Sequence, residues 1–106
     1  MPYFDFAVLV TNEQNEKLTY GLAKELDRDS LYFTYGGMFS QFRTQKMGQE
    51  CFHAVIDAAK FEYKRAAFAT KTKNTGMLKL GLTEGFEIVG MRLIKRVPFV
   101  ELLKEF

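Results

Sequence analysis

A short stretch from Arg43 to Gly48 joins cationic side chains to a glycine and could bind an anion. Apolar residues recur at helical spacing after it, so we expect the stretch to be a loop that opens a helix. The first amides of a helix lack partners within the helix, and the helix dipole favours negative charge there. Gly48 permits close backbone approach, while Arg43 and Lys46 add positive charge. The stretch therefore predicts an anion site, with an ordinary polar turn as the alternative.

Cys51 and His53 are the only cysteine and histidine in the chain. No internal disulfide and no Cys/His zinc set can form, so we expect no metal site. Cys51 falls on the apolar face of the predicted helix, which favours a buried small hydrophobe over a nucleophile. His53 lies one turn from Glu50 and Asp57 on the polar face, which favours a solvated, weakly paired histidine over a catalytic base.

The elements that must position these residues follow from hydrophobic periodicity and turn signals. The expected order is strands at residues 4–11, 18–26 and 31–39, a helix of about four turns after Arg43, a strand at 65–70, a short helix ending near Gly85, a strand at 86–94 and a hairpin at Pro98. Residues 22–26 would equally suit a helical turn. A helix between strands requires a crossover, so the strand at 65–70 should run parallel to the strand before the helix. The order β-β-β-α-β-α-β-β predicts an α+β fold with a mixed, mostly antiparallel sheet and helices on its faces.

The composition sets the limits within which these elements fold. The chain has 106 residues, of which 47% are hydrophobic and 26% charged, as in a single soluble globular domain spanning residues 1–106. A formal net charge of +2 suits an anionic ligand but falls short of the positive field of a dedicated nucleic-acid binder. No apolar run reaches the ~18 residues of a membrane span, and residues 1–6 do not look like a secretion signal. We expect a cytoplasmic protein with no membrane partner.

Two segments of this chain resemble the GCN5-related N-acetyltransferase (GNAT) family, whose core has the same order of elements. In that family a strand leads into an Arg/Gln-x-x-Gly-x-Gly/Ala loop that opens a long helix. The stretch from Arg43 to Gly48 occupies this position, with Lys46 in place of the middle glycine. Asn74, followed by Met77, resembles the family's Asn-x-x-Ala stretch, and Gly85-Phe86-Glu87 resembles its Gly-Phe-Glu strand start. The resemblance covers about half of the chain.

The resemblance implies an N-acyltransferase that uses acetyl-coenzyme A, or another acyl-coenzyme A, to acetylate an amine by direct attack on the thioester. It implies that the loop holds the pyrophosphate, that the backbone at the end of the third strand contacts the pantetheine amides, and that Asn74 contacts the pantetheine arm. A helix N-cap is the alternative for Asn74. The implied cofactor-binding residues are Met38, Phe39, Arg43, Thr44, Lys46, Met47, Gly48, Gln49 and Asn74, and no catalytic residue is assigned.

The chain also departs from the family pattern. Gly81 stands where members commonly carry a tyrosine whose phenol protonates the departing thiolate. Tyr32 or Tyr35 could replace it, although core packing or an interface is the favoured interpretation. The N-terminal strand and two helices that build much of the family's acceptor pocket have no counterpart before Phe4, so the acceptor side is expected to be truncated or supplied by another chain. A cationic group that could meet the coenzyme's 3′-phosphate, or form a solvated face, comprises Lys60, Lys64, Arg65, Lys71 and Lys73.

Two other functions stay open at this point. The first is a relative of the fold that has lost catalysis and serves as a coenzyme A-binding or structural subunit, which the changes at Lys46 and Gly81 favour. The second is a small nucleic-acid-binding domain that uses the aromatic residues 32–35 with the lysines, against which the near-neutral charge argues. Exposed strand edges and an aromatic-rich antiparallel half predict a homodimer.

Overall fold

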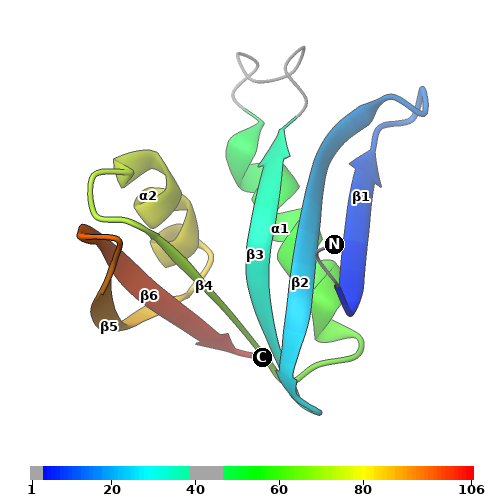
Figure 1. Cartoon of the computed structure of the whole chain (residues 1–106). Coiled ribbons are helices and arrows are strands. Elements are labelled where there is room, and N and C mark those ends of the chain that lie inside the picture. The colour runs from blue at the N-terminus through cyan, green and yellow to red at the C-terminus, as the bar shows by residue number, and fades with distance from the viewer. Residues whose placement is uncertain (1–3, 39–46) are drawn as a thin grey trace.

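The computed structural model describes residues 4–38 and 47–106 of the chain. Six strands form one mixed sheet in the spatial order β1-β2-β3-β4-β6-β5, with two helices behind it in the view of Figure 1. The strands are β1 (Phe6–Thr11), β2 (Lys17–Asp27), β3 (Ser30–Met38), β4 (Arg65–Lys71), β5 (Glu87–Ile94) and β6 (Val97–Glu105), and the helices are α1 (Gly48–Lys60) and α2 (Thr75–Thr83). The predicted element order is therefore confirmed.

β3 and β4 form the one parallel pair among the described strands, as the crossover rule predicts. Their pairing covers only four positions, from Ser30 opposite Arg65 to Phe33 opposite Phe68. Beyond that point each strand continues without pairing to the other, so the two diverge and the sheet opens as a V toward the start of α1 (Figure 1).

Both helices pack on the same face of the sheet. α1 buries Cys51, Val55, Ile56 and Ala59, which all lie on the apolar side of the helix that the sequence spacing predicts. Three rings join the helix to the sheet, because Phe52 of α1 packs against Phe68 and Phe86 with centroids 5.8 Å away. The main core cluster consists of Ile56, Ala66, Phe68, Phe86, Val100 and Leu102.

The predicted turn at Pro98 is wrong by two to three residues. Lys95 and Arg96 make the turn between β5 and β6 with φ angles of 51° and 68°, although neither is a glycine or an asparagine. Pro98 lies inside β6, opposite Leu93. Its carbonyl accepts a hydrogen bond from the N–H of Thr72, just past the end of β4. The nitrogen of Pro98 faces the same side, beyond the last paired residue of β4, so the missing N–H breaks no hydrogen bond of the β4–β6 ladder.

Candidate functional site

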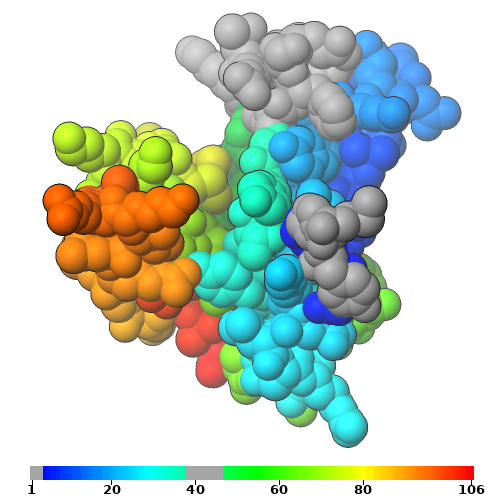
Figure 2. All heavy atoms as spheres, viewed as in Figure 1, coloured from blue at the N-terminus to red at the C-terminus, as the bar shows by residue number. Residues whose placement is uncertain are grey.

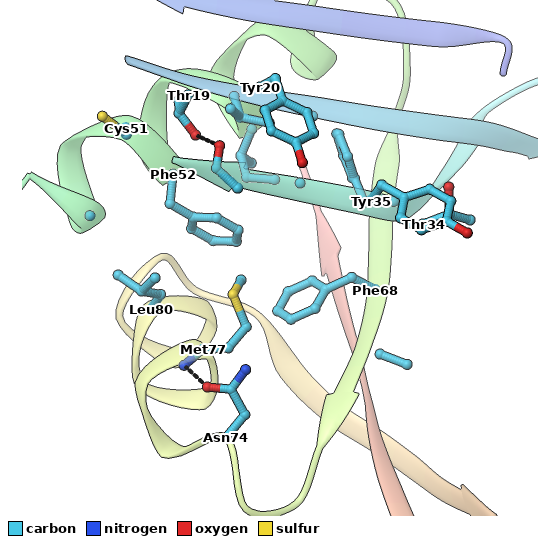
Figure 3. A pocket seen from close by; sticks show the side chains of 18 residues that line it. Thr19, Tyr20, Thr34, Tyr35, Cys51, Phe52, Phe68, Asn74, Met77 and Leu80 are labelled. Atoms are coloured by element: carbon cyan, nitrogen blue, oxygen red, sulfur yellow. Dashed lines mark hydrogen bonds between the residues drawn. The ribbon is translucent and has the colours of Figure 1, made fainter. Parts of the chain in front are cut away.

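A cavity of about 330 Å³ lies where β3 and β4 diverge, on the face that carries the helices (Figure 3). β2 and β3 form one wall, α1 and α2 another, and β4 the third. Most of the lining is apolar, and Phe52, Phe68, Met77 and Leu80 point toward one another across it in Figure 3. The cavity thus occupies the gap that the unpaired halves of β3 and β4 leave open.

The first residue of α1, Gly48, lines this cavity. Met47 precedes it and gives the helix no side-chain cap, so its first amides receive no such bond from that residue. A Cβ added at Gly48 would meet only Leu80, at 3.8 Å, which is an ordinary contact. Packing within the described residues therefore does not demand a glycine here, and the backbone has room for a ligand to approach.

Asn74 lines the cavity from the start of α2. Its side-chain oxygen accepts a hydrogen bond from the N–H of Met77 at 3.1 Å, so the N-cap alternative is confirmed. Figure 3 shows the amide nitrogen directed away from this bond, toward the cavity. Capping uses the oxygen alone, and the nitrogen keeps both of its donors for a ligand.

The other predicted cofactor-binding residues that the structure describes do not line the cavity. Met38 ends β3 at the open end of the V, and Met47 flanks the start of α1. Gln49 turns toward α2, where its amide donates to the Leu80 carbonyl at 3.5 Å and to Glu84 at 3.2 Å. The candidates that lie outside the described residues are Phe39, Arg43, Thr44 and Lys46.

Gly81 faces the core and not the cavity. A Cβ at this position would meet the Cζ atom of Phe68 at 2.8 Å and the Cδ2 atom of Leu102 at 3.2 Å. Both neighbours are buried, so α2 lies too close to the sheet to carry a larger residue here without movement. The chain therefore cannot present a phenol from this position of α2.

The two tyrosines considered from the sequence lie in different settings. Tyr32 accepts a hydrogen bond from Arg92 at 2.9 Å and lies under that guanidinium. Tyr35 is 61% exposed and lines the cavity, together with Tyr20, which sequence analysis did not single out. Tyr20 lies beside Gly37 through the pairing of β2 with β3, a neighbour relation that no local sequence signal carries.

A polar link joins α1 to α2 beside the cavity. His53 pairs with Glu84, and not with the Glu50 or Asp57 that helical spacing predicted. The Glu84 side chain is almost fully buried, and Lys104 donates to its backbone carbonyl at 2.6 Å. The His53 side chain is 63% exposed and does not line the cavity, which suits a structural contact between helices.

Cys51 is buried, as predicted, and lines the cavity from α1. Burial raises the pKa of its thiol, and the charge of Glu50 adds to the effect. A thiol held in this state is a poor nucleophile at neutral pH.

The predicted cationic group does not form one cluster. β4 separates its members, because Arg65 begins that strand and Lys71 ends it, about 20 Å away at ~3.3 Å per residue. At the first end Lys64 lies 4.0 Å from Asp29, and Arg65 donates to Ser30 at 2.9 Å. Of the predicted group, only Lys71 and Lys73 lie at the end of β4 that leads to Asn74 and the cavity.

Comparison with solved structures identifies this arrangement. The chain is similar to a GNAT family acetyltransferase from Elizabethkingia anophelis with acetyl-CoA bound, with a TM-score of 0.75 and 21% identity over 90% of this chain and 72% of that chain. It is also similar to a spermidine N-acetyltransferase chimera from Vibrio cholerae and hSSAT, with a TM-score of 0.80 and 11% identity over 93% of this chain and 65% of that chain. A third match is the spermidine/spermine N-acetyltransferase SpeG from Vibrio cholerae in complex with manganese ions. Its TM-score is 0.78, and the identity is 11% over 93% of this chain and 64% of that chain.

These similarities define an α+β fold of the acyltransferase kind, and in particular the fold of the GNAT acetyltransferases. The predicted fold class and the predicted resemblance are confirmed at that level. The chain spans slightly less than two thirds of the length of the Vibrio cholerae proteins. The sequence matches no protein-family model and no curated protein. Within the part of the chain that the structure describes, no helix is long and apolar enough to cross a membrane.

Proposed function

We propose that this protein binds an acyl-coenzyme A, with acetyl-coenzyme A the first candidate, and transfers the acyl group to an amine. The observation that carries this proposal is the cavity at the divergence of β3 and β4, which the first residue of α1 and the N-cap of α2 both line. The lone buried cysteine suits a reducing compartment, and we propose the cytoplasm.

The described residues fit the amide-rich arm of such a ligand. Past Phe33, the backbone groups of β3 that face β4 have no ladder partner on that strand, and the same holds for β4 past Phe68. Free strand amides and carbonyls can bond a chain that carries amides of its own. Asn74 offers two further donors, and the start of α1 at Gly48 offers amides to a phosphate group. The bound group would supply a thioester carbonyl as acyl donor.

Proton transfer needs a group from this chain. The acceptor amine must attack unprotonated, and the departing thiolate must gain a proton. With Gly81 closed off by Phe68, we propose that the exposed phenol of Tyr35, at the edge of the opening, donates that proton. Tyr32 is less suited because Arg92 already bonds its oxygen.

The second candidate function is a coenzyme A-binding or structural subunit without catalysis. The packing around Gly81 favours it, since it removes the acid that the resemblance implies. Binding is common to both candidates, and turnover of an amine separates them.

We also propose a homodimer that forms through β5. This strand lies at the outer edge of the sheet (Figure 1), and Ile88, Met91 and Leu93 on it are 54%, 65% and 72% exposed. Antiparallel pairing of two copies of β5, centred between Val89 and Gly90, would set Glu87 of each copy opposite Arg92 of the other and Ile88 opposite Met91. A single strand register then both covers the exposed apolar side chains of β5 and places opposite charges next to each other.

The test is calorimetric titration of acetyl-coenzyme A into the protein and into Gly48→Trp, whose indole would fill the space beside Leu80. We expect the variant to lose at least tenfold in affinity while it stays folded. Gly90→Trp is the matched control, because a Cβ there meets nothing within 4 Å and β5 lies away from the cavity. Equal affinities for the protein and for Gly48→Trp, or no binding to the unmodified protein, would overturn the proposal.

A further inference from the structure

A second cavity of about 330 Å³ lies on the sheet face opposite the helices. Its lining includes Lys24, Tyr32 and Phe99, which alternate along their strands with buried residues of the helix face. In Figure 2, which views this open face, the molecule is recessed between the orange β5–β6 hairpin and the cyan strands β2 and β3.

The two cavities share four lining residues, which are Phe33, Thr34, Tyr35 and Ala69. These residues lie just where β3 and β4 stop pairing, so the cavities meet at the opening of the V. A molecule in the second cavity could therefore reach the first through the sheet, without passing around its edge.

The lining of the second cavity is aromatic and apolar. Phe4, Tyr32, Tyr35 and Phe99 contribute rings, and Ile94 adds an aliphatic wall. Phe4 and Tyr35 contact edge to face with centroids 5.9 Å apart, which fixes the two rings against each other. Such a surface suits the flat, apolar body of a ligand.

The one charged side chain in the described lining of this cavity is positive. Lys24 is the one ionisable group of either charge sign in the described lining apart from the tyrosines, and it makes no ion pair with a described residue. Arg92 lies beside the rim on Tyr32, and the nearby carboxylate of Glu101 is taken up by that guanidinium at 3.3 Å. No carboxylate among the described lining residues is available to receive a ligand cation.

We propose that the second cavity selects an acceptor with an aromatic body, a primary amine and a carboxylate that Lys24 binds, which is the class of the aromatic amino acids. This inference rests on the proposed function and names the substrate of that same site. A polyamine is disfavoured, because its ammonium groups would meet Lys24 with no carboxylate among the described lining residues to offset that charge.

The reaction balances with the acyl-coenzyme A as co-reactant. The amine nitrogen forms a bond to the acyl carbon while the carbon–sulfur bond breaks. The nitrogen loses one proton and the sulfur gains one, so the products are an N-acyl amino acid and free coenzyme A.

The experiment compares L-phenylalanine, phenylethylamine, which lacks the carboxylate, and spermidine as acceptors of acetyl-coenzyme A, with release of the free thiol as the readout. We expect L-phenylalanine to react best and spermidine least. Lys24→Gln should reduce kcat/KM for L-phenylalanine at least tenfold and leave phenylethylamine within about twofold, because a charge-assisted bond to the carboxylate is lost. Lys79→Gln, at an exposed lysine of α2 that lines neither cavity, is the matched control.

Binding separates this inference from the proposed function. Calorimetry with acetyl-coenzyme A is run first, and L-phenylalanine is then titrated with chemical shifts of the aromatic rings as the signal. If acetyl-coenzyme A binds but spermidine is the best acceptor, or Lys24→Gln leaves the ranking unchanged, the inference fails and the proposed function stands. If acetyl-coenzyme A does not bind, the proposed function fails, and tenfold weaker binding of L-phenylalanine to Lys24→Gln would still support the selectivity of the cavity. Absence of L-phenylalanine binding would overturn the inference in either case.

Discussion

Gly81→Ala isolates the tight packing of α2 on the sheet. The added methyl carbon would lie 2.8 Å from Phe68 Cζ and 3.2 Å from Leu102 Cδ2 before any adjustment. Phe68 is 6% exposed and Leu102 is fully buried, and both belong to the main core cluster. Leu102 is enclosed, so relief must come from a shift of α2, from strained rotamers or from a movement of the Phe68 ring toward the cavity that it lines.

Two opposing effects set the size of the change. Overpacking a filled core costs about 1–3 kcal/mol, while alanine at an interior helix position recovers up to about 1 kcal/mol relative to glycine. The expected net loss in the free energy of unfolding is therefore between about 0 and 3 kcal/mol. For a domain of this size, each kcal/mol lowers the melting temperature by about 4–8 °C.

Urea unfolding followed by circular dichroism measures this loss. Gly76→Ala is the matched control in the same helix, because its Cβ would meet only the Asn74 oxygen, at 3.8 Å. We expect the control to match or exceed the stability of the unmodified protein, since it gains helix propensity without a clash. If Gly81→Ala is as stable as Gly76→Ala, the close approach of α2 to Phe68 and Leu102 is not real.

Two further predictions concern the other half of the core and the sheet edge. The hydrogen bond from Tyr63 to the Glu25 carboxylate, 2.5 Å long, raises the pKa of Tyr63 to about 12, with burial adding to it. The neutral phenol therefore stabilises the fold fully below about pH 10, and this stabilisation is lost as pH rises through about 12. Unfolding measured from pH 9 to 12 should show that loss, and Tyr63→Phe should flatten it; a Tyr63→Phe profile that matches the unmodified one would contradict the assignment. Met91→Lys should convert a dimer that forms through β5 into a 12.3 kDa monomer in sedimentation velocity, whereas Lys60→Gln should leave it unchanged, and a monomeric unmodified protein would refute the dimer.

Local sequence signals were sufficient to predict a residue's environment where that environment depends only on the helix or strand that contains the residue. The spacing of Cys51, Val55 and Ala59 predicts the buried face of α1, because a helix brings such positions together whatever surrounds it. The sequence left two roles for Asn74, a helix cap and a ligand contact, and the capping hydrogen bond is local to α2. The parallel pairing of β3 with β4 followed from chain connectivity alone.

Features that join distant elements could not be predicted in this way. Strand propensity continues past Phe33, so nothing in the local sequence marks the point where β3 leaves β4 and opens the cavity. His53 finds its partner at Glu84, 31 positions along the chain, and not one helical turn away. Ile88 and Met91 are typical of a buried strand, yet they are exposed because β5 lies at the sheet edge.

The packing of α2 and the chemistry of the opening are linked. A glycine at position 81 brings α2 onto Phe68, and Phe68 is both the last residue of β4 that pairs with β3 and a wall of the first cavity. The same contact that closes the core thus removes the proton donor from α2. We therefore propose β3 as the source of the proton, because Tyr35 lines both cavities at their shared opening. Tyr35→Phe should then abolish transfer to an amine while acetyl-coenzyme A still binds, because it removes the phenol oxygen and keeps the ring that packs on Phe4.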